Sequence, residues 1–328
     1  MARTTFFAST ICFQLLTINT VMAQSFEPII IAHRGASGYL PEHTLEAKAM
    51  AHAMDADYIE QDVVLSKDDV PVVLHDIHVD TISDVATRFP DHKRADGRYY
   101  ALDFTVVELK QLHVCERFNA KTGKQVFPKR FPKGISSFQI PTLEEELELI
   151  AGLNQSTGRI AGIYPEIKQP AWHLKEGHDI SRIVLSILHK HGYKTKQDRC
   201  YIQCFEHDEV IRLRSELGWE GRLILLMGTG KSDARFRTPE GLAELAMIAD
   251  GIGPDISSVI SADRKPTDLV KNAHAQKLQV HPYTLRVDEL PKFAKSADDL
   301  LNLLFNKAGV DGLFSDFPDV GIKWLERK

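Results

Sequence analysis

Two carboxylates lie two residues apart in an otherwise apolar run, Tyr58-Ile59-Glu60-Gln61-Asp62-Val63-Val64-Leu65. If this run is a β-strand, Glu60 and Asp62 share one face, because side chains alternate along a strand. Acids in a buried strand need a compensating charge, and a divalent cation is the simplest one. The alternative is a half-exposed strand with one polar face. A second strand-like run, residues 160–168, contains Glu166 near its end and would add a third carboxylate.

Two histidines end similar apolar runs. His33 and Arg34 follow one short run, and His75 follows another. Residues 66–69 are a turn signal, so the run before His75 is predicted to fold back beside the Glu60 strand as a hairpin. A single histidine is more often a surface or core residue than part of a site. A site is favoured here because polar groups recur at the ends of several strand-like runs.

Strand-like runs alternate with helical patterns along the chain. Leaving the hairpin partner aside, eight of them begin near residues 29, 58, 160, 200, 222, 251, 279 and 312. This alternation predicts a parallel sheet, and eight units predict an α/β fold of the (β/α)8 TIM-barrel type. Catalytic groups in such barrels lie at the C-terminal ends of the strands. The residues at those ends here are His33, Glu60, Asp62, Glu166, Gln203 and Asp316.

Helix start signals support the alternation. Thr44 is a predicted N-cap for a helix through Met54, and Thr142 forms a capping box with Glu145 that starts a helix through Leu149. We interpret the acids at 144, 145, 146 and 148 as the solvated face of that helix. Further helices are predicted near residues 177–190, 206–217, 239–249, 266–277 and 297–307.

The composition is that of one folded domain. The 328 residues suit a single barrel with an insertion, and a hydrophobic content of 43% supplies a core. We predict the domain over residues 24–328, with a small insertion at about 77–141, after the second strand and its hairpin, because that stretch is polar and rich in turns. A charged fraction of 26% with a net charge of −5 argues against disorder and against a nucleic-acid surface.

Residues 1–23 have the layout of a secretory signal peptide. Arg3 precedes an apolar stretch, and Ala23 precedes the expected cleavage point. The apolar stretch is short and interrupted, so we expect no stable membrane anchor, although an uncleaved anchor is the alternative. The mature protein is therefore predicted to be periplasmic or secreted.

Three cysteines follow the predicted signal peptide, Cys115, Cys200 and Cys204. An odd number allows at most one disulfide, and no Cys-x-x-Cys pattern occurs among them. Cys200 and Cys204 are too far apart in an extended segment to be bridged. We predict three free thiols.

Several segments resemble the glycerophosphodiester phosphodiesterase family. They are His33-Arg34-Gly35-Ala36-Ser37-Gly38-Tyr39-Leu40-Pro41-Glu42-His43-Thr44, Glu60-Gln61-Asp62, Leu74-His75-Asp76 and Tyr164-Pro165-Glu166-Ile167-Lys168. Others resemble its bacterial periplasmic branch: Tyr201-Ile202-Gln203-Cys204-Phe205, Asp250-Gly251-Ile252-Gly253-Pro254-Asp255, Val280-His281-Pro282-Tyr283-Thr284 and Gly312-Leu313-Phe314-Ser315-Asp316-Phe317-Pro318-Asp319. The resemblance spans nearly the whole chain after residue 23.

The resemblance implies a barrel with a small insertion after the His75 motif, and it implies a role for each matching residue. Glu60, Asp62 and Glu166 would hold one divalent cation, usually Ca²⁺ in the periplasmic branch and Mg²⁺ in others. His33 and His75 would be the acid–base pair, and Arg34 and Lys168 would hold phosphate oxygens. We add Gln203 as a predicted substrate-binding residue.

The implied reaction is metal-dependent hydrolysis of deacylated phospholipids, such as glycerophosphocholine and glycerophosphoethanolamine, to sn-glycerol 3-phosphate and an alcohol. An all-oxygen ligand set suits a hard cation. The sequence leaves open which histidine is the acid, whether water or a substrate hydroxyl attacks, and the oligomeric state. One alternative is a lysophospholipase D-type activity, which would need an apolar groove. Another is a non-catalytic surface or binding protein on the same scaffold, which would be expected to have lost a site residue.

Overall fold

Strands and helices alternate along the part of the chain that the computed structural model describes, which is Met1 and residues 27–327. Apart from Met1, the predicted signal peptide lies outside these residues. The strands are β1 Ile29–Ala32, β2 Tyr58–Leu65, β3 Pro71–Val73, β4 Gly162–Ile167, β5 Tyr201–Cys204, β6 Arg222–Met227, β7 Gly251–Pro254, β8 Gln279–Val280 and β9 Gly312–Ser315. The helices are α1 Leu45–Ala53, α2 Val85–Arg88, α3 Val106–Leu109, α4 Leu143–Thr157, α5 Pro170–Glu176, α6 Ile180–Lys190, α7 His207–Ser215, α8 Pro239–Leu245, α9 Ile256–Val259, α10 Leu269–Ala275, α11 Ala297–Leu301 and α12 Pro318–Glu326.

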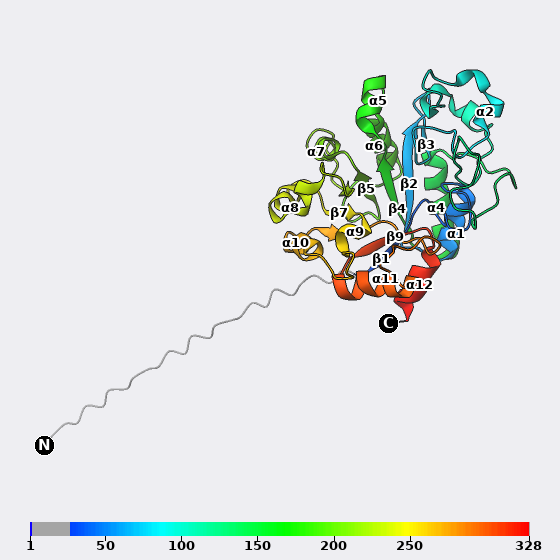
Figure 1. Cartoon of the computed structure of the whole chain (residues 1–328). Coiled ribbons are helices and arrows are strands. Elements are labelled where there is room, and N and C mark those ends of the chain that lie inside the picture. Colours follow the sequence, from blue (N-terminus) through cyan, green and yellow to red (C-terminus); the bar gives the residue numbers. More distant parts are fainter. Residues whose placement is uncertain (2–26, 328) are drawn as a thin grey trace.

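Eight parallel strands form a ring in the order β8-β7-β6-β5-β4-β2-β1-β9. The backbone N–H groups of Asp311 and Phe314 donate to the carbonyl oxygens of Val280 and Pro282, at 3.0 Å each, and so join β9 to the β8 end of the sheet. The larger helices surround this ring (Figure 1). The predicted TIM barrel is confirmed. The predicted hairpin is confirmed too, because β3 pairs antiparallel with β2.

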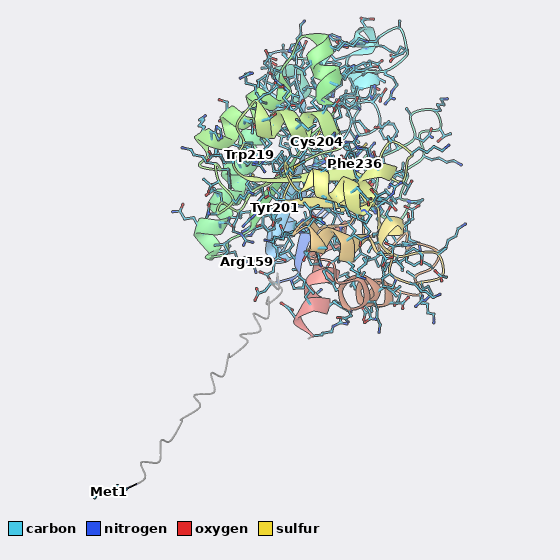
Figure 2. The ribbon with its side chains drawn as sticks, turned by 90° about the vertical axis from the view of Figure 1, so that its left-hand side faces the viewer. Met1, Arg159, Tyr201, Cys204, Trp219 and Phe236 are labelled. Carbon is cyan, nitrogen blue, oxygen red and sulfur yellow. The ribbon has the colours of Figure 1, made fainter. Side chains whose placement is uncertain are left out.

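Alternation along the strands divides the core into two layers. One face of each strand packs under the helices, where Cys204, Trp219 and Phe236 belong to the main apolar cluster (Figure 2). The other face fills the barrel with large side chains, among them Tyr164, whose ring stacks on Tyr201 at 4.8 Å between centroids. Because the period is two, Glu60 and Glu166 point to the same side as this inner aromatic layer and lie above it.

The two predicted capping signals are confirmed, whereas the bounds of several predicted helices differ from those in the structure. Thr44 caps α1, and the capping box of Thr142 with Glu145 starts α4, as predicted. α4 continues to Thr157, beyond the predicted end; its buried face extends to Ile150, and Leu153 and Asn154 after it are half-buried. The helix predicted at 177–190 is α6, which begins at Ile180; the preceding α5 was not predicted, and it ends at Gly177, which has a left-handed conformation with φ of 99°. No helix of residues 27–327 has the length and apolarity needed to span a bilayer.

Residues 77–141 lie between β3 and α4 and form short helices and isolated bridges rather than barrel strands. Figure 1 shows this segment, drawn in cyan to green, beside the end of β2 and β3. It has its own apolar cluster, which includes Val79, Leu109, Leu112 and Phe138 and continues onto Val72 of β3. This shared cluster fixes the segment against the carboxyl end of the barrel.

Cys115, Cys200 and Cys204 are free thiols in the structure, as predicted.

The expectation that the acids of α4 are all solvated is wrong for one of them. Glu146 is not on a solvated face but is fully buried, where it forms an ion pair with Lys48 of α1 at 3.0 Å. Burial raises the pKa of Glu146 to about 7, even beside the Lys48 ammonium. The misreading arose because Glu146 lies one residue before the buried Leu147, so the helical period puts it at the edge of the apolar stripe.

Replacing Lys48 with methionine is expected to lower the free energy of unfolding by about 3 kcal/mol, because it leaves buried polar groups without a partner. Those groups are the Glu146 carboxylate and Nδ1 of His43, which lie 3.0 Å and 3.2 Å from the ammonium, and the backbone carbonyl of Glu60. The double variant Lys48→Met/Glu146→Leu should regain part of the loss. Urea unfolding at pH 7 measures both, and a single variant as stable as the wild type would contradict the expectation.

His173 anchors α5 against β2 in one protonation state. The N–H of Leu65 donates to its Nε2 at 3.3 Å, so the ring hydrogen sits on Nδ1, which donates to the carbonyl of Gln169 at 3.0 Å. Burial lowers the pKa of His173 to about 4 in the folded protein, from 6.5 in the unfolded chain. Between these values the unfolded chain binds more protons, so stability is lost as the pH falls from 6.5 toward 4.

We therefore expect His173 to account for about 2 kcal/mol of the stability lost between pH 7.5 and pH 5. Denaturant unfolding of the wild type and of His173→Gln at both pH values measures the contribution. The variant should show the smaller difference between the two pH values. Equal differences in the two proteins would rule out this role for His173.

Candidate active site

A small cavity opens at the carboxyl end of the barrel, with a volume of about 110 Å³. Six of the eight predicted site residues line it: His33, Arg34, Glu60, His75, Glu166 and Gln203. Lys168 lines an adjoining hollow of about 190 Å³ that shares His75 and Glu166 with the first. Asp62 lies beside both, because it faces the same side of β2 as Glu60. The structure thus brings all eight residues together, although they come from five strands, β1 to β5, and the loops that follow them.

The carboxylates of Glu60, Asp62 and Glu166 form a compact group in which one oxygen of each lies within 4.8 Å of the others. All three are at least 95% buried. In the register of the sheet, Asp62 of β2 is opposite Glu166 of β4. Oδ1 of Asp62 and Oε1 of Gln203 are buried and accept no hydrogen bond from any described residue. Buried oxygen atoms that accept no hydrogen bond, close to other carboxylate oxygens, are suitable ligands for a hard divalent cation.

The pKa shifts of the triad also favour a bound cation. Burial, together with the charges of Asp62 and Glu166, raises the pKa of Glu60 well above its usual value. Burial also raises the pKa of Glu166 to about 8, although Lys168 opposes the rise from 2.7 Å. Three carboxylates this close repel one another when ionised, and the charges of Lys168 and Arg34 compensate this repulsion only in part. A bound cation would relieve this repulsion.

One oxygen of Asp62 accepts a hydrogen bond from His43, and the contacts of His43 determine its tautomer. Lys48, which can only donate, lies 3.2 Å from Nδ1 of His43, so Nδ1 accepts and the ring hydrogen is on Nε2. Nε2 then donates to Oδ2 of Asp62 at 2.7 Å. Burial would raise the pKa of Asp62, but the charge of Lys168 and the hydrogen bond from His43 hold it well below its usual value. The carboxylate is therefore ionised, with one oxygen occupied and the other free.

Each of the two predicted catalytic histidines is oriented by its own carboxylate. Nδ1 of His33 lies 2.5 Å from Oδ1 of Asp316, and Nδ1 of His75 lies 2.7 Å from Oδ1 of Asp76. An ionised carboxylate only accepts, so both rings carry their hydrogen on Nδ1 and leave Nε2 free. Nε2 of His33 lies 3.9 Å from Oε2 of Glu60. This histidine therefore borders the carboxylate triad directly.

Both imidazoles are neutral at pH 7 in this structure. Burial, with help from the Arg34 charge, lowers the pKa of His33 to about 4 in spite of Asp316. Burial and the charges of Arg34 and Lys168 lower the pKa of His75 to about 4. A neutral ring with a free Nε2 is ready to accept a proton.

The segment from His33 to Thr44 turns sharply so that Arg34 reaches the cavity. Arg34 has a left-handed backbone with φ of 60°, and its N–H donates to Oε2 of Glu60 at 2.8 Å. A side chain on Gly35 would place its Cβ 2.8 Å from the backbone of Ala47, so only glycine fits there. The Arg34 guanidinium donates to Glu42 at 2.9 Å.

A family model for the glycerophosphoryl diester phosphodiesterase family matches residues 33–320, which is most of the chain. The chain belongs to this family. Two relatives named glycerophosphodiester phosphodiesterase agree: that of Haemophilus influenzae is 43% identical, over 92% of this chain and 90% of its own, and that of Treponema pallidum is 37% identical, over 91% and 92%.

Solved structures support the fold of this phosphodiesterase family member. A structure described as a putative glycerophosphoryl diester phosphodiesterase, from Silicibacter pomeroyi, superposes with a TM-score of 0.71 at 22% identity, covering 93% of this chain and 95% of its own. An Oleispira antarctica phosphodiesterase solved in complex with the product sn-glycerol-3-phosphate superposes with a TM-score of 0.64 at 23% identity, covering 93% and 99%. At these identities the likeness establishes the barrel.

Sequence reasoning did not assign a role to several residues that this phosphodiesterase site uses. Asp316 was recognised only by its place at the end of a strand, and Asp76 only by its place beside His75. Arg117 and Arg130 were not singled out, because both come from the polar, turn-rich segment and carry no local signal. Only their contacts in the folded chain show that they reach the histidines' carboxylates.

Proposed function

We propose that this protein hydrolyses glycerophosphodiesters, such as glycerophosphocholine and glycerophosphoethanolamine, to sn-glycerol 3-phosphate and an alcohol. The observation that carries the proposal is that a carboxylate triad, two oriented neutral histidines and two positively charged side chains, those of Arg34 and Lys168, meet at one cavity. The names of the relatives at 43% and 37% identity support the same reaction. The histidine, arginine, carboxylate and amide side chains that line the cavity suit a charged phosphodiester group.

In the proposed site Glu60, Asp62 and Glu166 hold one divalent cation, Ca²⁺ in preference to Mg²⁺. When bound, such an ion would neutralise charge on the phosphate and favour displacement at phosphorus. Arg34 presents a planar guanidinium that can meet two phosphate oxygens, and Lys168 adds a compact positive charge. Gln203, proposed above to bind substrate, donates its amide to Oε1 of Glu60 at 2.8 Å and so also orients a ligand of the cation.

His33 and His75 are proposed to move the protons. One ring accepts the proton of the attacking hydroxyl at its free Nε2, and the other gives a proton to the leaving alkoxide. The ring that acts as the acid must first be protonated. A bound phosphodiester anion favours that form, because a nearby negative charge raises the pKa of an imidazole and opposes the effect of Arg34. Asp316 and Asp76 keep the two rings oriented during both transfers.

Release of glycerol 3-phosphate from glycerophosphocholine by the purified protein tests the proposal. We expect hydrolysis that stops in EDTA and returns with added Ca²⁺ and, less fully, with Mg²⁺. The same assay with a lysophospholipid substrate should give little product. Absence of hydrolysis with every diester and ion, or faster turnover of the lysolipid, would refute the proposal.

We further propose that residues 1–23 direct the protein out of the cytoplasm, so that it acts in the periplasm or outside the cell. The basis is the signal-like layout of Arg3, the apolar stretch and Ala23. N-terminal sequencing of the protein recovered from cell fractions tests this proposal. A mature chain that starts near Gln24 is expected, and a full-length chain in the cytosolic fraction would refute it.

A further inference from the structure

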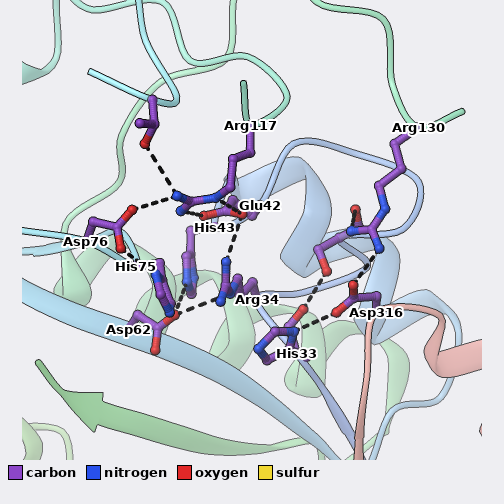
Figure 3. Close-up of polar contacts among 12 residues, drawn as sticks. His33, Arg34, Glu42, His43, Asp62, His75, Asp76, Arg117, Arg130 and Asp316 are labelled. Atoms are coloured by element: carbon purple, nitrogen blue, oxygen red, sulfur yellow. Dashed lines mark hydrogen bonds and ion pairs between the residues drawn. The ribbon is translucent and has the colours of Figure 1, made fainter. Parts of the chain in front are cut away.

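Two arginines of the segment between β3 and α4 reach the proposed active site, and each contacts the carboxylate that orients one histidine (Figure 3). Nη1 of Arg117 donates to Oδ2 of Asp76 at 2.6 Å, and Oδ1 of the same carboxylate contacts His75. Nη2 of Arg130 donates to Oδ2 of Asp316 at 2.6 Å, and its Oδ1 contacts His33. Both carboxylates thus use one oxygen for an arginine and the other for a histidine.

Arg117 also contacts a second carboxylate of the site, that of Glu42. It donates to both oxygens of Glu42, with its Nη2 at 2.5 Å and its Nε at 3.1 Å. Glu42 in turn accepts from Arg34, which is proposed to bind phosphate. Burial would raise the pKa of Glu42, but the charges of Arg117 and Arg34 hold it well below its usual value. Through Asp76 and Glu42, Arg117 therefore links the proposed proton-transfer residue His75 with the proposed phosphate-binding residue Arg34.

Arg130 is locked in place from several sides. Its side chain is 95% buried, it forms a bidentate contact with Asp288 at 2.8 Å and 3.0 Å, and its guanidinium lies 3.7 Å above the ring of Phe127. Arg286 also lies near Asp316, at 3.2 Å, so Asp316 keeps one cation if Arg130 is removed. Burial would raise the pKa of Asp316, but His33 and these guanidinium groups hold it well below its usual value. An ionised Asp316 is the form that keeps the hydrogen of His33 on Nδ1.

We infer that the 77–141 segment completes the active site: Arg117 and Arg130 are positioning residues that hold the carboxylates orienting His75 and His33. The inference rests on the proposed function of the two histidines. It gives the segment a role in turnover besides the packing of its own apolar cluster, because two of its side chains set the geometry of the proton-transfer groups.

The two arginines should differ in their kinetic effects. Arg117→Met should lower kcat and raise KM, each by about 10-fold or more, because it loosens both His75 and Arg34. Arg130→Met should lower kcat by about 10-fold with little change in KM, since its contacts with Asp316 and the Ser37 carbonyl include neither Arg34 nor Glu42. Arg94→Met is the matched control. Arg94 belongs to the same segment and binds Asp103 with two hydrogen bonds of 2.8 Å, but it does not contact a histidine carboxylate.

A double-variant cycle separates positioning from general loosening. If Arg130 acts through Asp316, the effect of Arg130→Met on kcat should largely disappear in the Asp316→Asn background. Multiplicative effects of the two changes would contradict the inference. So would Arg117→Met and Arg130→Met enzymes that behave like Arg94→Met in kcat and KM.

A second readout does not depend on turnover. In ¹⁵N spectra of the histidine side chains, His33 and His75 of the wild type should carry their hydrogen on Nδ1. Arg130→Met should give His33 a mixture of the two tautomers, because Asp316 stays ionised beside Arg286 but is no longer held in position against the ring. Arg117→Met should do the same for His75 by freeing Asp76, while Arg94→Met changes neither. Spectra that are identical in all variants would overturn the inference. If the wild type hydrolyses no glycerophosphodiester, the proposed function fails, and these spectra still decide whether the arginines position the rings.

Discussion

Replacing His75 with alanine should reduce kcat for glycerophosphocholine by about 1000-fold or more, and replacing His33 should have a similar effect. Each ring has a free Nε2 at the cavity and a carboxylate on Nδ1, at 2.7 Å for His75 and 2.5 Å for His33. Loss of either ring removes one of the two proposed proton-transfer groups, while the barrel and the triad stay in place. KM should change much less than kcat, because Arg34 and Lys168 remain to hold the phosphate.

Steady-state kinetics measure this effect, with circular dichroism to verify the fold. His113→Ala is a suitable control, because that side chain is about half exposed in the 77–141 segment and pairs with Asp84. The control should keep wild-type kcat. A His33→Ala or His75→Ala protein with near-normal turnover would remove that residue from the mechanism.

The second large effect is expected for the carboxylate triad. Stripping the cation with EDTA should abolish hydrolysis, and Glu166→Gln should abolish the response to added Ca²⁺. A ligand that binds only the folded state also stabilises it, by about 2.7 kcal/mol at 100 times its dissociation constant. Added Ca²⁺ should therefore raise the thermal unfolding midpoint of the wild type but not that of Glu166→Gln.

Calorimetric titration with Ca²⁺ and with Mg²⁺ measures the affinity without any substrate. Glu148→Gln serves as the control, because Glu148 is exposed on α4 and should leave Ca²⁺ binding unchanged. Equal Ca²⁺ affinity in Glu166→Gln and the wild type would place the ion elsewhere. A site that prefers Mg²⁺ would correct the proposed ion and keep the triad.

Part of the site could be predicted from the sequence, because the signals for that part are local. The period of two along β2 is enough to put Glu60 and Asp62 on one face, and eight alternating units are enough to predict a barrel whose strand ends converge. The turn at 66–69 predicts the hairpin that carries His75 toward the triad. Each of these inferences concerns residues a few positions apart, or a rule that holds for a whole fold class.

Other features depend on residues far apart in the chain. The buried ion pair of Lys48 with Glu146 could not be predicted, because an acid at the edge of an apolar stripe looks the same whether water or a lysine faces it. Likewise, Arg130 and Asp316 are 186 residues apart, and His33 and Asp316 are 283 apart. No local pattern marks such partners.

The sequence by itself determined the barrel, the order of its elements and the types of group at its carboxyl end, because hydrophobic period and turn chemistry act over short distances. Only the tertiary structure decided which carboxylate orients which histidine, which oxygen of Asp62 stays free, and that Arg117 and Arg130 reach back to the site. Those choices depend on hydrogen-bond direction and distance between side chains, which exist only once the strands have closed and the 77–141 segment has packed against them.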